Sequence, residues 1–138
     1  MQYNLETDQA TPVLLDIDSM KDDVVLLLDT FFYICIWKGQ TITAWEKEGY
    51  QNEPEYANLK TLLETPEADA EYIMSERFPM PRYFICTPGD TNERKIKVHV
   101  NPSKQETGNS TLESGNFVTE DVSLSVFMQH LIKMAVTA

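Results

Sequence analysis

The stretch that decides the fold of this chain is Asp22-Asp23-Val24-Val25-Leu26-Leu27-Leu28-Asp29-Thr30-Phe31-Phe32-Tyr33-Ile34-Cys35-Ile36-Trp37-Lys38-Gly39. Residues 24–28 are a continuous apolar run bounded by acids, which is typical of a strand buried on both faces. Residues 31–37 are aromatic and β-branched, and they predict a second strand in which Trp37 is buried. Because only Asp29 and Thr30 separate the two runs, we expect an antiparallel hairpin.

The composition is that of one ordinary globular domain: 138 residues, 42% hydrophobic and 24% charged. Acids outnumber bases 22 to 11, which gives a formal net charge of −11. Nucleic-acid binding is disfavoured because attraction to phosphates needs a basic face, and adsorption to an anionic membrane is disfavoured for the same reason. The apolar runs over residues 24–28 and 31–37 are both far too short to span a bilayer, and the first residues lack the pattern of a signal peptide.

After the hairpin the apolar residues take helical spacing. We expect one helix over residues 41–48, a second that Pro54 opens, and a third from the start signal Thr65-Pro66-Glu67 to about Arg77. The connector 78–82 contains two prolines and cannot be helical. It leads into a predicted strand over residues 83–86.

The last third of the chain is expected to contain a strand, a loop and a helix. Ile96, Val98 and Val100 alternate with polar residues, as in a strand with one buried face. Residues 103–116 have the composition of a solvated loop, of which 104–115 should be the least ordered internal segment, and residues 117–119 fit a short edge strand. A closing helix over residues 121–135 has an apolar stripe in which we expect Phe127 to be buried.

These elements predict an α+β domain with a mixed sheet. We expect the domain to span residues 12–138, because residues 1–11 are polar and are predicted to form a flexible tail.

Metal and nucleophile chemistry has little support in the sequence. Cys35 and Cys86 are the only cysteines and form no C-x-x-C motif, so we expect a buried free thiol at Cys35 and a reducing compartment. His99 and His130 have no cysteine at ligand spacing. We therefore predict no metal site and no cofactor.

Two groups of acids are better explained as solvated surface than as sites. The first fails as a calcium loop because Lys21 and Leu27 occupy the required glycine and glutamate positions. The second flanks Gly49 in a region of loops and helix ends, where paired carboxylates in a very acidic chain are usually solvated. The first group is Asp16, Asp18, Asp22 and Asp23, and the second is Glu46, Glu48, Glu53 and Glu55.

Arg94 is an isolated arginine where a polar turn meets the expected strand over residues 95–100. From there a long planar cation can extend away from the body of the domain. On the residues alone, Arg94 is most simply a solvated surface arginine.

Several blocks, in order, resemble one protein family. They are Asp29-Thr30-Phe31-Phe32, Gly49-Tyr50-Gln51-Asn52-Glu53-Pro54-Glu55-Tyr56, Ser75-Glu76-Arg77-Phe78-Pro79-Met80-Pro81-Arg82-Tyr83, Val100-Asn101-Pro102-Ser103, Thr119-Glu120-Asp121-Val122-Ser123-Leu124 and Val126-Phe127-Met128-Gln129-His130-Leu131. From about Pro12 to Ala138 the chain resembles the C-terminal gelsolin-like domain of the Sec-twenty-three family, the GTPase-activating subunit of the inner coat protein complex II (COPII) layer.

The resemblance implies a sheet with a long helix on one face and a shorter helix on the other. It also implies that the domain supplies an arginine finger to a bound Sar-type small GTPase. The spacing between Pro79-Met80-Pro81-Arg82-Tyr83 and Val100-Asn101-Pro102-Ser103 places that finger on Arg94, catalytic in trans. The flanks differ from the family pattern: Gly89-Asp90-Thr91-Asn92-Glu93 precedes Arg94 and Lys95-Ile96-Lys97 follows it. The posture of the finger is therefore left open, with an exposed head group and a loose pair with Glu93 or Asp90 as the expectation.

The same resemblance implies partners and a location. The partners are the Sar-type GTPase, the inner-layer cargo-adaptor subunit and the outer-layer coat subunit, with no nucleic acid and with membrane contact only through the assembled coat. The location is the cytosolic face of endoplasmic reticulum exit sites and COPII vesicles, in transport towards the Golgi. The resemblance further implies a domain excised from a longer subunit that has no catalytic site of its own.

Two alternatives stay open. The fold-level likeness also fits a calcium-regulated, actin-binding module of the gelsolin and villin type. A pure interaction scaffold that docks other coat proteins through proline-rich segments is compatible with GTPase activation.

Overall fold

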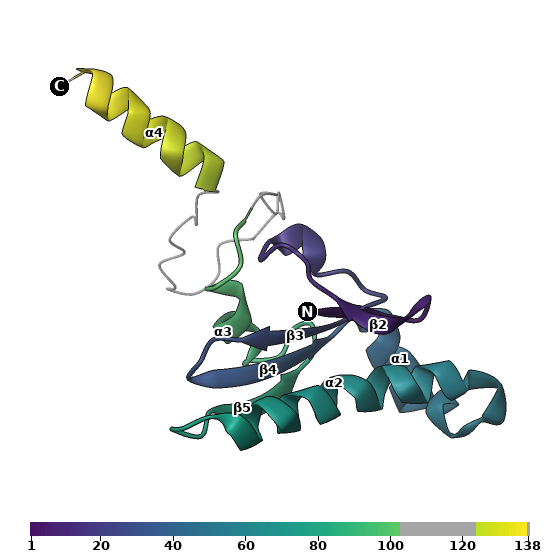
Figure 1. The fold of residues 1–138 in the computed structure, drawn as a ribbon. Helices are drawn as coiled ribbons and strands as arrows, with labels where there is room; N and C mark the ends of the chain where they lie inside the picture. The colour runs from purple at the N-terminus through teal and green to yellow at the C-terminus, as the bar shows by residue number, and fades with distance from the viewer. Residues whose placement is uncertain (103–123, 138) are drawn as a thin grey trace.

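The computed structural model describes residues 1–102 and 124–137. The described part is built on a five-stranded sheet of order β2-β1-β3-β4-β5 (Figure 1). The β4–β5 pair is parallel and the other pairs are antiparallel, which confirms an α+β domain with a mixed sheet. The strands are β1 (Gln2–Asn4), β2 (Thr7–Thr11), β3 (Val25–Asp29), β4 (Tyr33–Lys38) and β5 (Arg82–Cys86).

The predicted hairpin is confirmed as β3 and β4, with Leu27 opposite Ile36. Successive side chains of these strands alternate between the two faces of the sheet. Trp37, predicted to be buried, is 3% exposed. Gly39 follows β4 where a Cβ atom would lie 2.3 Å from the backbone oxygen of Asp22, so no side chain fits there.

The expectation of a flexible tail over residues 1–11, with the domain starting at residue 12, is wrong. β1 lies between β2 and β3, and Tyr3 is 4% exposed with its hydroxyl donating to Asp69 at 2.7 Å. Backbone hydrogen bonds hold these residues, and a polar edge strand such as β2 needs few apolar side chains. The domain therefore includes its first residues.

The helices between β4 and β5 are fewer and longer than predicted. The helix expected over 41–48 is confirmed as α1 (Gln40–Glu48), which ends at Gly49 with a left-handed φ of 84°. The two further helices expected from Pro54 and from Thr65 are instead one helix, α2 (Ala57–Glu76), with Pro66 inside it. Short 3₁₀ turns, η2 (Tyr50–Asn52) and η3 (Pro54–Tyr56), join α1 to α2, and η1 (Ile17–Ser19) precedes β3.

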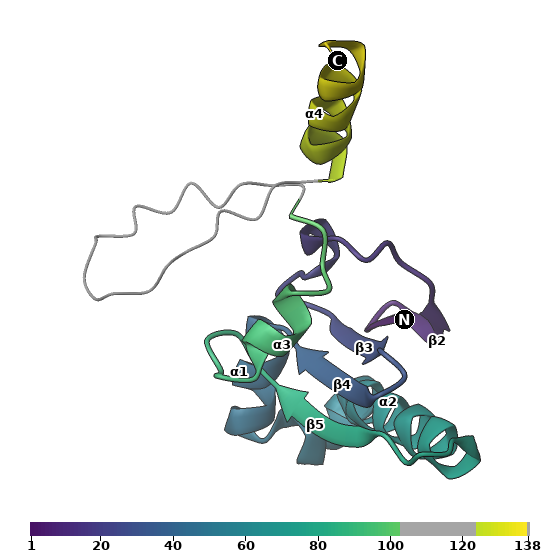
Figure 2. The same cartoon turned by 90° about the vertical axis from the view of Figure 1, so that its left-hand side faces the viewer.

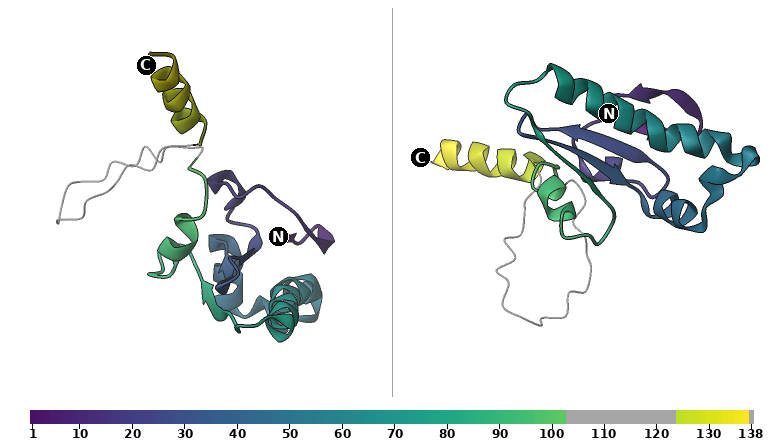
Figure 3. Two further views of the ribbon diagram at one scale, coloured as in Figure 1. Left: turned by 60° about the vertical axis from the view of Figure 1, so that its left-hand side comes forward. Right: turned by 90° about the horizontal axis from the view of Figure 1, so that it is seen from below.

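Each face of the sheet has its own apolar core. On one face, α2 packs Leu59, Leu62 and Ala70 against strand residues such as Ile34 (Figures 1 and 3). On the other face, strand residues including Trp37 pack with Val24, Cys35, Cys86 and Ile96. The sheet is therefore covered from both sides, by a long helix and by a shorter one.

A strand was predicted around Ile96, Val98 and Val100, and this prediction is wrong. Residues Glu93–Lys97 form the short helix α3, which lies beside β5 (Figure 2). Ile96 is 3% exposed but Val98 is 72% exposed, so the two side chains do not share a buried face as they would in a strand. The peptide N–H of Val98 donates instead to the carbonyl of Arg94 at 3.2 Å, as in a helical turn.

The closing helix is α4 (Leu124–Thr137), which confirms a helix near the end of the chain. The expected burial of Phe127 is wrong: the residue is 49% exposed, because α4 stands apart from the sheet (Figure 1). The N–H of Leu124 donates to Asn101 Oδ1 at 2.8 Å. The loop and edge strand predicted within residues 103–119 lie outside the described residues. Within the described ranges, none of the helices combines the length and apolar character that a transmembrane segment needs.

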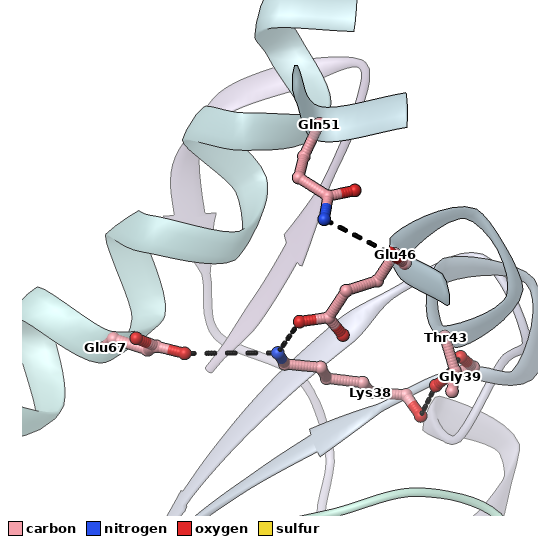
Figure 4. A network of polar contacts seen from close by, with 6 residues as sticks. All are labelled: Lys38, Gly39, Thr43, Glu46, Gln51 and Glu67. Carbon is pink, nitrogen blue, oxygen red and sulfur yellow. Dashed lines mark hydrogen bonds and ion pairs between the residues drawn. The ribbon is translucent and has the colours of Figure 1, made fainter. Parts of the chain in front are cut away.

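A buried lysine joins the end of β4 to α1 and α2 (Figure 4). Lys38 is 5% exposed, and its Nζ atom lies 2.9 Å from Glu46 and 3.9 Å from Glu67. Glu46 was predicted to be a solvated acid, yet it satisfies a charge that would otherwise be costly to bury. This contact fixes the junction from which the chain runs into α1.

Candidate functional site

Arg94 lies on α3 and is exposed, as predicted for its head group. Among residues 1–102 and 124–137, none forms a hydrogen bond or an ion pair with its guanidinium. An exposed arginine with a free planar fork is available to a planar anion of a partner.

The acids next to Arg94 are bonded elsewhere, so the loose pair expected with Glu93 or Asp90 is not seen. Glu93 Oε2 accepts a hydrogen bond from the backbone N–H of Gly89 at 3.0 Å, and Oε1 lies 3.6 Å from Nζ of Lys97. Asp90 Oδ1 accepts from the N–H of Asn92 at 3.3 Å. The carboxylates of Glu93 and Asp90 therefore bond to groups other than Arg94, and neither neutralises its guanidinium.

The base of α3 is held against the sheet. Ile96 inserts into the second core beside Cys86, the last residue of β5. Lys95 lies over the ring of Phe84, 5.0 Å from its centroid, and donates to Asn92 Oδ1 at 2.8 Å. The backbone under Arg94 is consequently anchored while its side chain projects into solvent.

A contact between Tyr33 and His99 closes the other end of α3. The Tyr33 hydroxyl forms a short hydrogen bond with Nε2 of His99 and reaches the carbonyl oxygen of Lys95 at 3.4 Å. His99, expected on the polar side of a strand, lies instead in the turn that follows the helix. This pair fastens the turn after α3 to the start of β4.

The structure also contains an aromatic pocket that the sequence analysis did not identify. It is an open pocket of about 380 Å³ formed by α1, η2, η3, the start of α2 and the β1–β2 turn. The rings of Tyr50 and Tyr56 are 5.1 Å apart, and a hydrogen bond to Glu48 raises the pKa of the Tyr50 hydroxyl. The lining residues are Leu5, Trp45, Tyr50, Glu55, Tyr56, Asn58 and Leu59. The clustering of three aromatic residues within positions 45–56 was the available signal.

The candidate metal and thiol groups do not form an evident reactive site. Residues 1–102 and 124–137 contain no cluster of three or more His, Cys, Asp or Glu side chains that could hold a metal ion. Asp16, which belongs to the acidic group that was considered as a calcium loop, accepts hydrogen bonds from Asn101 Nδ2 at 2.6 Å and from the N–H of Asp18 at 3.0 Å. Cys35 and Cys86 are buried with their Sγ atoms 3.6 Å apart, and this contact and burial raise the pKa of the Cys35 thiol. The thiol therefore stays protonated and is a poor nucleophile.

A comparison with models of protein families matches residues 6–95 to the gelsolin repeat. The matched segment begins just before β2, includes the whole α1–α2 region and ends at α3, one residue after Arg94. It accounts for more than half of the chain and includes the exposed arginine and every residue that lines the aromatic pocket except Leu5.

Proposed function

The chain belongs to the gelsolin-repeat family, and from this premise we propose that it is a coat domain that activates GTP hydrolysis. Arg94 would enter the nucleotide site of a Sar-type GTPase as an arginine finger. The domain would belong to a subunit of the Sec-twenty-three type in the COPII coat at endoplasmic reticulum exit sites. The observation that carries the proposal is the exposed, unneutralised guanidinium of Arg94 on an anchored helix.

The chemistry of such a site is electrostatic. During phosphoryl transfer, negative charge spreads over the oxygens of the γ-phosphoryl group, and a planar guanidinium can donate two parallel hydrogen bonds to them. A fixed cation stabilises this charge without reorganising during the reaction. The domain therefore needs no catalytic site, metal or cofactor of its own, because the GTPase supplies the nucleotide.

The direct test is single-turnover GTP hydrolysis by a Sar-type GTPase, with the domain placed in the complete coat subunit. We expect Arg94→Ala to remove most of the stimulation, since arginine fingers contribute on the order of 10³–10⁵ in rate. Arg94→Lys should also fail, because an ammonium lacks the planar fork. Arg82→Ala, which removes another exposed arginine, is the matched control and should leave stimulation intact.

Two further measurements define the effect. Binding of the GTPase should survive Arg94→Ala, because the finger acts mainly on the transition state. The stability of the domain should change by no more than about 0.5 kcal/mol, as is usual for exposed positions. Persistent stimulation by the Arg94→Ala protein would contradict the proposed role of this residue.

The family also contains the alternative of a calcium-regulated actin-binding module, which a separate pair of measurements addresses. A specific calcium ligand would raise the thermal midpoint by mass action. We expect millimolar calcium to leave the midpoint unchanged and the domain to stay in the supernatant when actin filaments are sedimented. A calcium-dependent shift together with co-sedimentation would favour the actin-binding function.

The aromatic pocket favours a second, compatible function as a docking site for proline-rich segments of coat proteins. Extended proline-rich peptides bind grooves lined by aromatic rings, because their preformed helix loses little entropy on binding. Trp45, Tyr50 and Tyr56 supply such rings, and Glu55 at the rim suits a peptide with basic flanks. Titration with a proline-rich peptide, monitored by Trp45 fluorescence and repeated on Tyr50→Ala, tests this function.

A further inference from the structure

We propose that Glu93 is a positioning residue for Arg94. Its carboxylate fixes the turn before α3 and thereby sets the direction in which the neighbouring guanidinium projects. This inference rests on the proposed function of Arg94 and specifies how the domain holds the finger.

The contacts of Glu93 reach both ways along the chain. One carboxylate oxygen accepts from the N–H of Gly89, four residues earlier, at 3.0 Å, and the other lies 3.6 Å from Nζ of Lys97, four residues later. The side chain is only 14% exposed, although α3 lies at the surface. The carboxylate therefore ties the turn to the helix instead of extending into solvent.

The residue that Glu93 holds has an unusual backbone. Gly89 has a φ of 81°, in the left-handed region that glycine adopts at little cost, and a Cβ atom at this position would meet nothing within 4 Å. Two backbone hydrogen bonds, from Asp90 to Thr87 and from Glu93 to Asp90, shape the turn, and the side-chain bond from Gly89 to Glu93 adds to them in setting its angle relative to α3. That angle determines where the backbone of Arg94 begins.

The same contacts remove a competitor for the guanidinium. A carboxylate adjacent in sequence to an arginine can pair with it, and a paired finger would first have to be released before it reached a phosphate. Glu93 bonds to Gly89 and Lys97 instead, and none of the described residues pairs with the Arg94 guanidinium. Glu93 thus acts on the position of the finger and on its availability, without contacting the nucleotide.

The test compares three variants in the complete coat subunit, with GTP hydrolysis followed over a range of subunit concentrations. Glu93→Ala should lower the maximal rate by between about tenfold and about 100-fold, because a misplacement of about 1 Å can cost on the order of 10²-fold. Its half-saturating concentration should stay unchanged. Glu93→Gln should retain most of the rate, since an amide oxygen still accepts from Gly89. Lys97→Ala removes the ion pair but keeps that hydrogen bond, so it should lose less of the maximal rate than Glu93→Ala.

Amide hydrogen exchange at Gly89 supplies a readout that does not depend on activity. Exchange should be faster in Glu93→Ala than in Glu93→Gln. Full maximal rate in Glu93→Ala, or an equal loss in Glu93→Ala and Glu93→Gln, would overturn the positioning role even if Arg94→Ala is inactive. Full stimulation by Arg94→Ala would overturn the proposed function itself, so the two failures can be told apart.

Discussion

At the scale of single residues, the turn between β3 and β4 depends on one aspartate. Phe31 has a φ of 73°, which is rare for a bulky residue. Its N–H donates to Asp29 Oδ1 at 2.8 Å, and its ring lies beneath the guanidinium of Arg77, 5.3 Å from it. Arg77 in turn donates to Asp29 Oδ2 at 2.7 Å. One carboxylate therefore holds both the unusual backbone and the cation that covers it.

This arrangement predicts a pH-dependent contribution to stability. The hydrogen bond from Arg77 holds the pKa of Asp29 below its usual range, so the stabilisation is present above the unfolded pKa of about 3.9 and is lost as the pH falls through the lower folded value. We expect Asp29→Asn to lower the free energy of unfolding by about 0.5–1 kcal/mol at pH 7, because the pair is partly exposed. Urea unfolding at pH 7 and at about pH 2 checks this, and an equal difference at both values would contradict it.

At the scale of elements, the sequence predicted the strands and helix ends whose structure depends on neighbouring residues in the chain. The β3–β4 hairpin and the end of α1 at Gly49 follow from local apolar patterns and a helix stop signal. The N-terminal strands could not be read in this way, since β2 is polar and is held by backbone pairing. Pro66 suggested a helix start. Inside α2 it cannot donate to the carbonyl of Leu62, but the burial of Leu62 and Leu63 before it and of Ala70 after it keeps the helix continuous.

The candidate site was predictable only in part. The exposure of Arg94 followed from its polar surroundings, and its proposed role came from the resemblance. The bonds that hold Glu93 and Asp90 away from it depend on the turn at Gly89, which no local pattern specifies. The aromatic pocket depends on how η2 and η3 fold against α1 and α2, so its rings meet only in three dimensions.

A helix and a strand at residues 93–97 predict different effects of truncating Ile96 and Val98. In a strand, Ile96 and Val98 would share one buried face, but in the helix only Ile96 is buried. We expect Ile96→Ala to lower the free energy of unfolding by about 2–4 kcal/mol, as core truncations do. Val98→Ala is the matched control and should change it by less than about 0.5 kcal/mol. Similar losses for both variants in urea unfolding would favour the strand.

At the scale of the whole molecule, the proposed activation of a GTPase would need more contact surface than one small domain offers. Stable protein interfaces bury about 1,600 Å² in total, shared between the partners. A finger accelerates hydrolysis only when the remaining interface holds it in place, because positioning supplies much of the effect. The position of Arg94 on α3, at one margin of the described sheet, is consistent with a partner that also needs other contacts (Figure 2).

We therefore expect the isolated chain to be a weak activator. Single-turnover hydrolysis by a Sar-type GTPase should be far slower with residues 1–138 alone than with the complete subunit at the same concentration. Raising the concentration of the isolated chain should recover only part of the rate, because contacts made by the rest of the subunit would also orient the proposed finger. Equal stimulation by the two proteins would show that this domain holds the GTPase by itself.

The parallel pairing of β4 with β5 also determines the order in which the domain can fold. The β3–β4 hairpin closes over a short turn. Pairing of β5 with β4, by contrast, closes a loop that contains the whole α1–α2 segment. Pairings of high sequence separation form late, because the entropy of closing the loop must be lost first. The helix α3, which holds Arg94, packs through Ile96 beside Cys86 at the end of β5, so we expect it to form only after β5 has paired. Local opening at this edge would displace Arg94 while the hairpin and the first core persist, so we expect the proposed activation to fail before the fold does.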